Sequence, residues 1–320
     1  MKEKKIKINE HSNFSIFGWV HNFVYSGLEV LFFSGIIIVL GILSGCSSAP
    51  KKPAEIFTNR IIAANQLNMA NQTANQGRYE DALLILEEAR RLAIGADDPA
   101  LRIKTATSRG NILFSMGRHS EAFSDWENAA AEGDASGEIV LAALARIYAI
   151  RAELVLLSNE VDQSGKNLAA EAEELKTRLT REIALARSDS LSAAAGYVTL
   201  AMASKQIGAW AEAESTARRA LDIHEKNRYL EEAAYDWFII ASIRSVAGNY
   251  EPSLQALRMA ISYDRRAENS FGLASSWQAM GDVYQKAGQP EESIKAYRRA
   301  VEIFKAINLN NRASELEAKL

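Results

Sequence analysis

One uncharged apolar run and one repeated pattern of small and large side chains organise the sequence. The run extends from Val30 to Leu43, and the repeated pattern occupies the chain from about residue 60 onward. Five copies of the pattern align on a glycine, and the intervals between these glycines are 40, 91, 40 and 40 residues: Gly77, Gly117, Gly208, Gly248 and Gly288. Such self-similarity at a fixed period predicts a repeat architecture.

Small residues recur at three fixed offsets from each glycine. They stand twelve positions after it (Ala89, Ala129, Ala220, Ala260, Ala300), five after it (Ala82, Ala122, Ala213, Ser253, Ser293) and seven before it (Ala70, Gly110, Ala201, Ala241, Gly281). Small side chains at helical spacing let two antiparallel helices approach closely, and glycine supplies the positive φ that ends the first helix. Each copy is therefore predicted to be a helix hairpin, which must stack on its neighbours to bury its apolar face.

The interval of 91 residues has room for one further, irregular hairpin. We expect its helices at Glu138 to Leu157 and Asn167 to Ala186, joined by the connector "SNEVDQSGK", so that the irregular unit covers about 138–187. Asp98 and Pro99 are typical of a helix N-cap and first residue. The charged segment 309–320 has one apolar stripe and is predicted to be a capping helix over the end of the stack.

The pattern resembles the tetratricopeptide repeat, and the last copy matches its signature best. That copy has the signature residues Trp277, Met280, Gly281, Tyr284, Gly288, Tyr297 and Ala300. The resemblance implies an all-α protein, a right-handed α-solenoid of about six TPR-like hairpins over residues 56–308. Its period of about 40 exceeds the 34 of the family. HEAT and armadillo arrays have similar periods but lack the offsets centred on glycine.

The N-terminal segment has the pattern of an export signal. Lysines precede the apolar run, and Leu43, Ser44 and Gly45 lead to the single cysteine, Cys46. These four residues resemble the lipobox of bacterial lipoproteins, which implies a signal peptide over 1–45, lipidation of Cys46 with palmitate-type acyl chains, and a tether over 46–55. The alternative is an uncleaved signal anchor with an incidental cysteine. The resemblance implies a membrane-anchored protein of the cell envelope, with the outer membrane facing the periplasm favoured over the inner membrane.

Composition and charge exclude several functional classes. The 320 residues carry a formal net charge of −3 without a cluster of basic residues, so no surface that binds nucleic acid is expected. His119 and His224 are the histidines after Cys46 and fall in different repeats, and no phosphate loop or zinc-helix motif is present. We therefore expect no catalytic residue, no metal, no cofactor and no enzymatic activity.

The first helices of the hairpins line the concave face of such an array. In related proteins, asparagine six residues before the turn glycine grips a peptide, and here that position is Asn71 and Asn111 in the first two copies. With Asn68 and Lys104 they form a candidate partner-binding groove, and the alternative is that these polar residues only solvate an open surface.

We therefore expect a lipid-anchored scaffold that binds protein or peptide partners in cell-envelope assembly. The sequence does not decide whether the protein forms oligomers. The alternative function is an accessory subunit of a solute transport system that associates with a periplasmic solute-binding protein.

Overall fold

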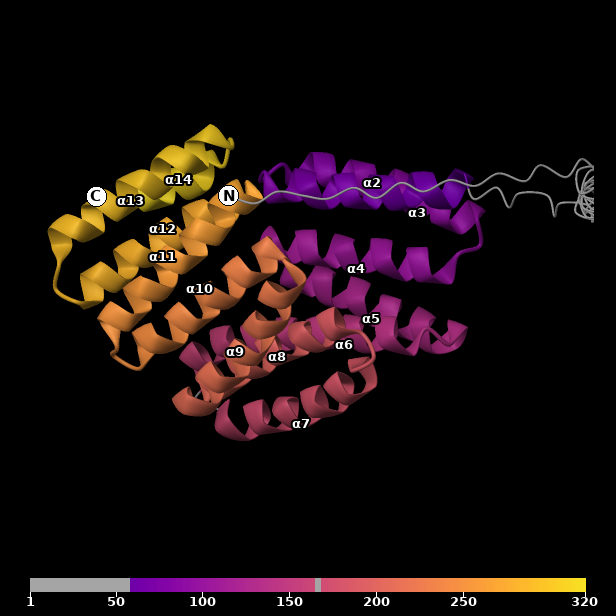
Figure 1. Ribbon diagram of the computed structural model, residues 1–320, viewed down its shortest axis with the longest axis horizontal. Helices are drawn as coiled ribbons and strands as arrows, with labels where there is room; N and C mark the ends of the chain where they lie inside the picture. The colour runs from indigo at the N-terminus through magenta and orange to yellow at the C-terminus, as the bar shows by residue number, and fades with distance from the viewer. Residues whose placement is uncertain (1–57, 165–167) are drawn as a thin grey trace, which may run out of the picture. The chain divides into compact units, whose positions relative to one another are not determined.

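Paired antiparallel helices make up the computed structural model, which describes residues 58–164 and 168–320 (Figure 1). The described residues contain thirteen α-helices and no strand. None of these helices combines the length and the apolar composition needed to span a bilayer. The lipobox residues Leu43, Ser44 and Gly45, the lipidation site Cys46 and the tether lie outside the described residues.

Twelve of the described helices form six hairpins in chain order, and the last helix follows them. The hairpins are α2 (Thr58–Asn75) with α3 (Tyr79–Gly95), α4 (Pro99–Ser115) with α5 (His119–Ser136), α6 (Ile139–Ser164) with α7 (Leu168–Ala186), α8 (Ser190–Gln206) with α9 (Trp210–Asn227), α10 (Leu230–Val246) with α11 (Tyr250–Ala267), and α12 (Ser270–Lys286) with α13 (Pro290–Ala306), followed by α14 (Asn310–Glu317). The prediction of an all-α solenoid of about six hairpins is confirmed.

The connector predicted inside the irregular hairpin is wrong in most of its length. Helix α6 continues through residues 158–164 and ends at Ser164, whereas the prediction ended it at Leu157. The physical reason is that no glycine or proline interrupts the sequence between Leu157 and Gly165, so the helix propagates. The α4 cap is as predicted, because Asp98 accepts a hydrogen bond from the Leu101 amide at 3.0 Å and Pro99 begins the helix.

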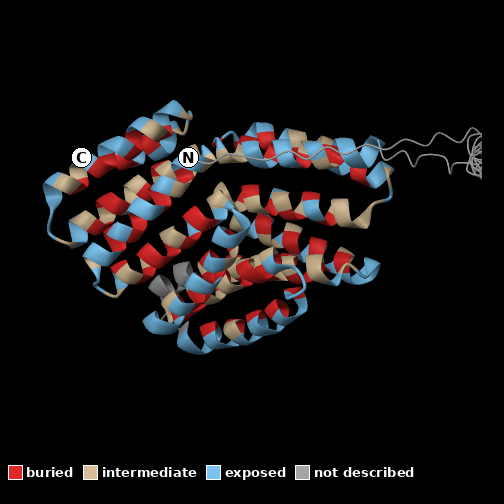
Figure 2. Cartoon of the chain, in the orientation of Figure 1, coloured by how far each residue is buried: buried red, intermediate tan, exposed pale blue. Residues whose placement is uncertain are grey.

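Small side chains fill the contact between the two helices of each regular hairpin. All fifteen residues at the three predicted offsets are buried, as the red stripes of Figure 2 illustrate. Two serines at the second offset strengthen this contact, because Ser253 and Ser293 donate to the carbonyl oxygens of Ala241 and Gly281 at 2.7 and 2.9 Å. The recurrent small residue therefore serves close approach of the helices, and its hydroxyl, where present, joins them.

Two kinds of turn separate the helices. The five turn glycines within the regular hairpins all have positive φ, between 71° and 81°. Twenty positions after each of them, between hairpins, the chain again has positive φ, at Asp97, Gly137, Arg228, Glu268 and Asn308. Only one of these five is glycine, so the second turn carries no sequence signature of the kind that marks the first.

The two ends of the array meet. The Tyr79 ring, at the start of α3, contacts the Phe271 ring of α12 edge-on, with 5.9 Å between ring centroids. Leu309, in the turn before α14, packs against the same cluster of buried residues in α2 and α3. Stacked hairpins thus close on themselves within residues 58–320, and their first helices surround a common interior (Figure 1).

Helix α14 covers the end of the last hairpin. Its apolar stripe consists of Ala313 and Leu316, which pack with Phe304 of α13 in one cluster. Both residues of the stripe are buried, whereas the rest of α14 is exposed and polar. This is the arrangement expected of a capping helix.

The close approach of α12 and α13 generates the first testable prediction. We expect Gly281→Ala to lower the free energy of unfolding by about 1–3 kcal/mol, because an added Cβ would overlap the buried Tyr297 ring. The matched control is Gly95→Ala at the end of α3, where an added Cβ meets nothing within 4 Å, and this change should be neutral or stabilising. Urea unfolding measures both, and equal midpoints for the two variants would contradict the packing argument.

Candidate binding cavity inside the array

A cavity of about 480 Å³ lies where the first helices converge. Its lining comes from α2, α4, α6, α8 and α10, with His224 from the last turn of α9 and Asn269 from the residue before α12. The volume is within the range of small-molecule and peptide side-chain pockets. Because nearly every first helix contributes a wall, the cavity depends on the closed stacking of the hairpins.

Two lining residues of the cavity, Arg151 and Lys104, carry positive charge. The Arg151 guanidinium lies over the rings of Tyr148 and Tyr235, at 4.9 and 5.8 Å from their centroids. Its Nε is 3.4 Å from the Thr199 hydroxyl, and no carboxylate of the described residues is within ion-pair distance of Arg151. The two tyrosines therefore hold this cation in place by cation–π contact. Lys104 is exposed at the same cavity.

Two adjacent glutamates, Glu231 and Glu232, lie in the first turn of α10 and line the same cavity. Glu231 is half-buried, and its Oε2 accepts a hydrogen bond from the Asn75 side chain at the end of α2. Burial and the neighbouring Glu232 carboxylate raise the pKa of Glu231, and the Asn75 hydrogen bond offsets part of this increase. The helix N-terminus favours both carboxylates, but no cation of the described residues pairs with either one.

A buried acid, Asp236, forms part of the cavity wall. Its Oδ2 lies 2.6 Å from Nδ1 of His224, and the two side chains are 0% and 6% exposed. Burial raises the pKa of Asp236 to about 6, although the His224 contact acts in the opposite direction. The second oxygen, Oδ1, is buried and has no hydrogen-bond partner within the described part of the chain. An unpartnered buried carboxylate oxygen is costly, so this atom needs a physical explanation.

An adjoining cavity of about 350 Å³ shares three lining residues with the first. Asp264 of α11 lies in its wall, where Asn269 donates a hydrogen bond to Oδ1 at 2.8 Å. Burial raises the pKa of Asp264 to about 7. His224 and Asp264 stand sixteen residues after their turn glycines, so the same repeat position carries a buried polar group in two successive hairpins.

The structure separates the residues of the predicted groove. Lys104 lines the cavity, and the Asn111 amide lies close enough to the buried Tyr148 hydroxyl to offset part of the rise in its pKa. Asn68 and Asn71 are exposed on α2 and are not among the described residues that line the cavity. Asn75, one turn further along α2, reaches it instead.

Sequence reasoning missed the acidic wall. The pairs Glu231 with Glu232 and Glu291 with Glu292 look alike in the sequence, and both occupy the first turn of a helix. Only the first pair faces the interior, because it begins the inner helix of its hairpin. Helix order within the hairpin is the signal that distinguishes them.

Three of the tryptophans in the described residues pack in the core. Trp126 is buried and donates to the Thr107 carbonyl at 3.1 Å, while Trp237 and Trp277 pack against the central core cluster. Trp210 is 38% exposed.

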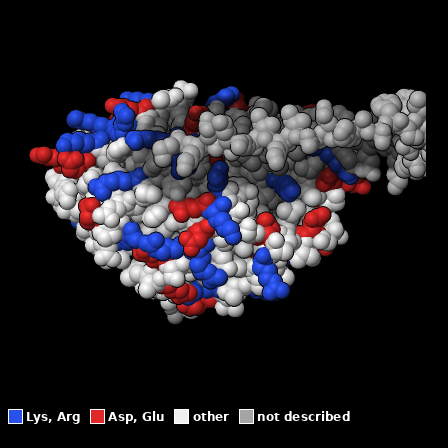
Figure 3. All heavy atoms as spheres, in the orientation of Figure 1, with Lys and Arg blue, Asp and Glu red and all other residues white. Residues whose placement is uncertain are grey.

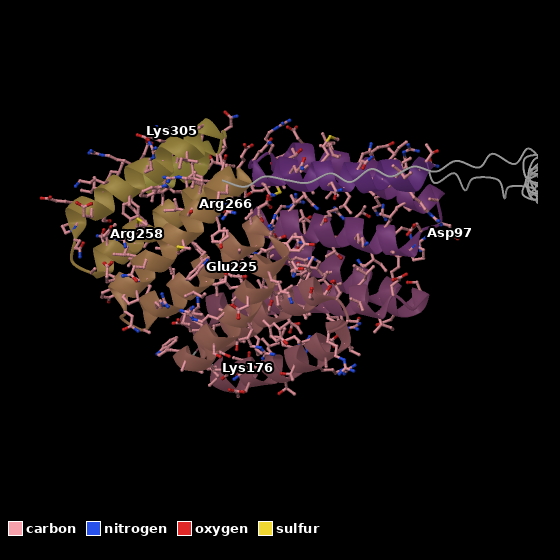
Figure 4. The ribbon with its side chains drawn as sticks, in the orientation of Figure 1. Asp97, Lys176, Glu225, Arg258, Arg266 and Lys305 are labelled. Atoms are coloured by element: carbon pink, nitrogen blue, oxygen red, sulfur yellow. The ribbon has the colours of Figure 1, made fainter. Side chains whose placement is uncertain are left out.

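On the surface visible in Figure 3, charges of both signs are interspersed. The labelled Arg258, Arg266 and Lys305 of Figure 4 come from α11 and α13, the second helices of their hairpins.

Within the described ranges, no group of three or more histidine, cysteine, aspartate or glutamate side chains could hold a metal ion.

The buried carboxyl group of Asp264 generates the second prediction. We expect Asp264→Asn to leave the free energy of unfolding nearly unchanged at pH 4 and to raise it by roughly 1–4 kcal/mol at pH 8. The reason is that a pKa raised from 3.8 to about 7 stabilises the fold only while the carboxyl is protonated, and this contribution is lost as pH rises. Asparagine keeps an acceptor for Asn269.

Urea unfolding between pH 4 and pH 8 measures this effect, with Asp222→Asn on the exposed face of α9 as the control. A difference between parent and Asp264→Asn that stays constant over this pH range would contradict the assignment.

Comparison with known proteins supports the repeat architecture. A family model described as tetratricopeptide repeat matches residues 231–306. No curated protein matches the sequence. Among solved structures, the signal transduction ATPase with a tetratricopeptide repeat sensor from Pyrococcus horikoshii aligns with TM-score 0.51 and 14% identity, covering 84% of this chain and 43% of that chain.

Two Rap proteins align similarly. A Rap protein complexed with competence and sporulation factor has TM-score 0.51 and 14% identity, covering 83% of this chain and 75% of its own. The Rap conjugation gene regulator of plasmid pLS20, in complex with the Phr* peptide, has TM-score 0.50 and 13% identity, covering 78% and 76%. Residues 231–306 are tetratricopeptide repeats, and the described chain is an all-α solenoid of tetratricopeptide-like hairpins.

Proposed function

We propose that this protein is a lipid-anchored scaffold of the cell envelope that binds a peptide segment of a partner protein in its central cavity and performs no catalysis. The observation that carries the proposal is the cavity of about 480 Å³ walled by the inner helices of the hairpins. It exposes tyrosine rings, an oriented arginine and carboxylates at one place, the mixture of apolar surface and few polar groups that binding pockets have.

The shape of the array supports a peptide as the occupant. Closure of the stack at Tyr79 and Phe271 brings the inner helices around a cavity of about 480 Å³, a volume that can hold a few peptide side chains. The two Rap structures of similar fold are complexes, one with competence and sporulation factor and one with the Phr* peptide. Repeat solenoids in general are binding scaffolds because stacking creates extended concave surfaces.

The envelope location rests on the sequence before the solenoid. The apolar run and the four residues Leu43, Ser44, Gly45 and Cys46 support export and acylation of Cys46, with the solenoid held near a membrane by the tether. A scaffold fixed at a membrane surface meets its partners at raised effective concentration, which favours a role in assembly of envelope structures.

Filling the cavity tests the binding proposal. We expect Ala195→Trp to abolish capture of a defined set of partners by crosslinking in cells of the native host, because the indole would occupy the space beside Ala195 of α8. Leu84→Trp is the matched control, since Leu84 is 73% exposed on α3. Mass spectrometry quantifies the partners and urea unfolding checks that both variants fold. Identical partner sets for the parent and Ala195→Trp would contradict binding in the cavity.

Replacing the cysteine tests the anchor. In a bacterial host fed radiolabelled palmitate, the parent should be labelled and sediment with membranes, whereas Cys46→Ala should be unlabelled. Ser47→Ala, which changes the next residue, should behave as the parent. Absence of label from the parent would refute lipid anchoring and would leave the cavity proposal intact.

A further inference from the structure

Two carboxylates of the cavity wall have no ion-pair partner among the described residues. Glu231 and Glu232 are adjacent, both line the cavity, and no described lysine or arginine is within ion-pair distance of either. Asn75, the group that does contact Glu231, is a neutral amide. Glu231 is half-buried and Glu232 is exposed, and the two carboxylates repel each other without a cation between them.

An independent observation points in the same direction. Asp236 is 0% exposed and lines the same cavity one turn further along α10, and its Oδ1 atom lacks a partner within the described residues. Its other oxygen is already occupied by His224. A buried carboxylate with a vacant acceptor beside a cavity is suited to a hydrogen-bond donor delivered by a ligand.

The charge of Arg151 offsets part of the rise in the pKa of Asp236, but no described lysine or arginine forms an ion pair with Glu231, Glu232 or Asp236. Arg151 is held against Tyr148 and Tyr235 and contacts Thr199, while Lys104 is exposed on α4. Tyr148 and Tyr235 also line the cavity, and their rings are already in contact with the Arg151 guanidinium. The carboxylates of Glu231, Glu232 and Asp236 are therefore the part of the cavity wall that is suited to an organic cation.

We propose that the cavity selects peptides by a cationic group, an ammonium or guanidinium, which binds between Glu231, Glu232 and Asp236. This inference rests on the proposed function and specifies its ligand class. The cation comes either from a lysine or arginine side chain or from a free N-terminal amine, since both present the same charge and hydrogen-bond donors. A peptide cation relieves the repulsion between the two glutamates and gives the buried Asp236 a partner.

The test uses a synthetic pentapeptide mixture in which every position is randomised among Ala, Leu, Phe, Ser, Glu, Lys and Arg. One half of the mixture has free N-termini and the other half is acetylated. The full chain is immobilised through a C-terminal tag, and bound peptides are sequenced by mass spectrometry. The variant is Glu231→Gln with Glu232→Gln, in which glutamine keeps an acceptor for Asn75. The control is Glu174→Gln with Glu291→Gln, two exposed carboxylates outside the cavity.

For the parent and the control, we expect one of two results. Either the bound acetylated peptides are enriched about tenfold in Lys and Arg over Ala at one position, or peptides with a free N-terminus are retained about tenfold more than acetylated ones. The first result assigns the cation to a side chain and the second to the N-terminus. The cavity variant should lose the enrichment and still bind peptides rich in Leu and Phe. Asp236→Asn should reduce it as well, by removing the third charge.

Peptide binding without any preference for cations, or with enrichment of Glu, would overturn the inference and leave the proposed function standing. Failure of the parent to retain any peptide would overturn both. Enrichment that survives unchanged in the cavity variant would also overturn the inference, because the cation would then bind elsewhere.

Discussion

Close approach of paired helices at small side chains is the constraint on which the rest of this structure depends. Fifteen buried positions in five hairpins carry only Gly, Ala or Ser, and the two serines bond across the contact. Packing at this distance repeats the same geometry from hairpin to hairpin, so that small rotations accumulate regularly along the array. A larger residue at any of these positions would open one hairpin and displace everything stacked after it.

Regular stacking explains why the ends of the array meet, and closure in turn creates the interior site. The contact of Asn75 with Glu231 joins residues 156 positions apart, and the contact of Tyr79 with Phe271 joins the first hairpin to the last one. Such contacts follow from the sum of many local geometries. The cavity is therefore a property of the whole array, and substitutions in any hairpin contact should affect ligand binding as well as stability.

The difference between local helix contacts and closure of the whole array also decides what the sequence could predict. The glycine offsets predicted the five regular hairpins, because close helix contact demands a particular residue size at each point. The turns between hairpins gave no such signal, since Arg228, Glu268 and Asn308 adopt positive φ without being glycine. Of the predicted groove, Lys104 lines the cavity and Asn111 lies beside Tyr148, whereas Glu231 and Asp236 were missed. Their role depends on closure, which no local pattern encodes.

The position sixteen residues after the turn glycine carries a buried polar side chain only in the two hairpins whose residue there lines a cavity. It is buried in all five regular hairpins, and three of them have Ala93, Gly133 and Phe304 there. The remaining two, next to the cavities, have His224 and Asp264, and His224 contacts Asp236. An apolar residue fits this position elsewhere in the same chain, so packing does not require a titratable one. His224 and Asp264 are buried polar residues that cost folding free energy, and both lie beside the interior cavities. Their presence is explained if these cavities recognise a polar ligand, as proposed above.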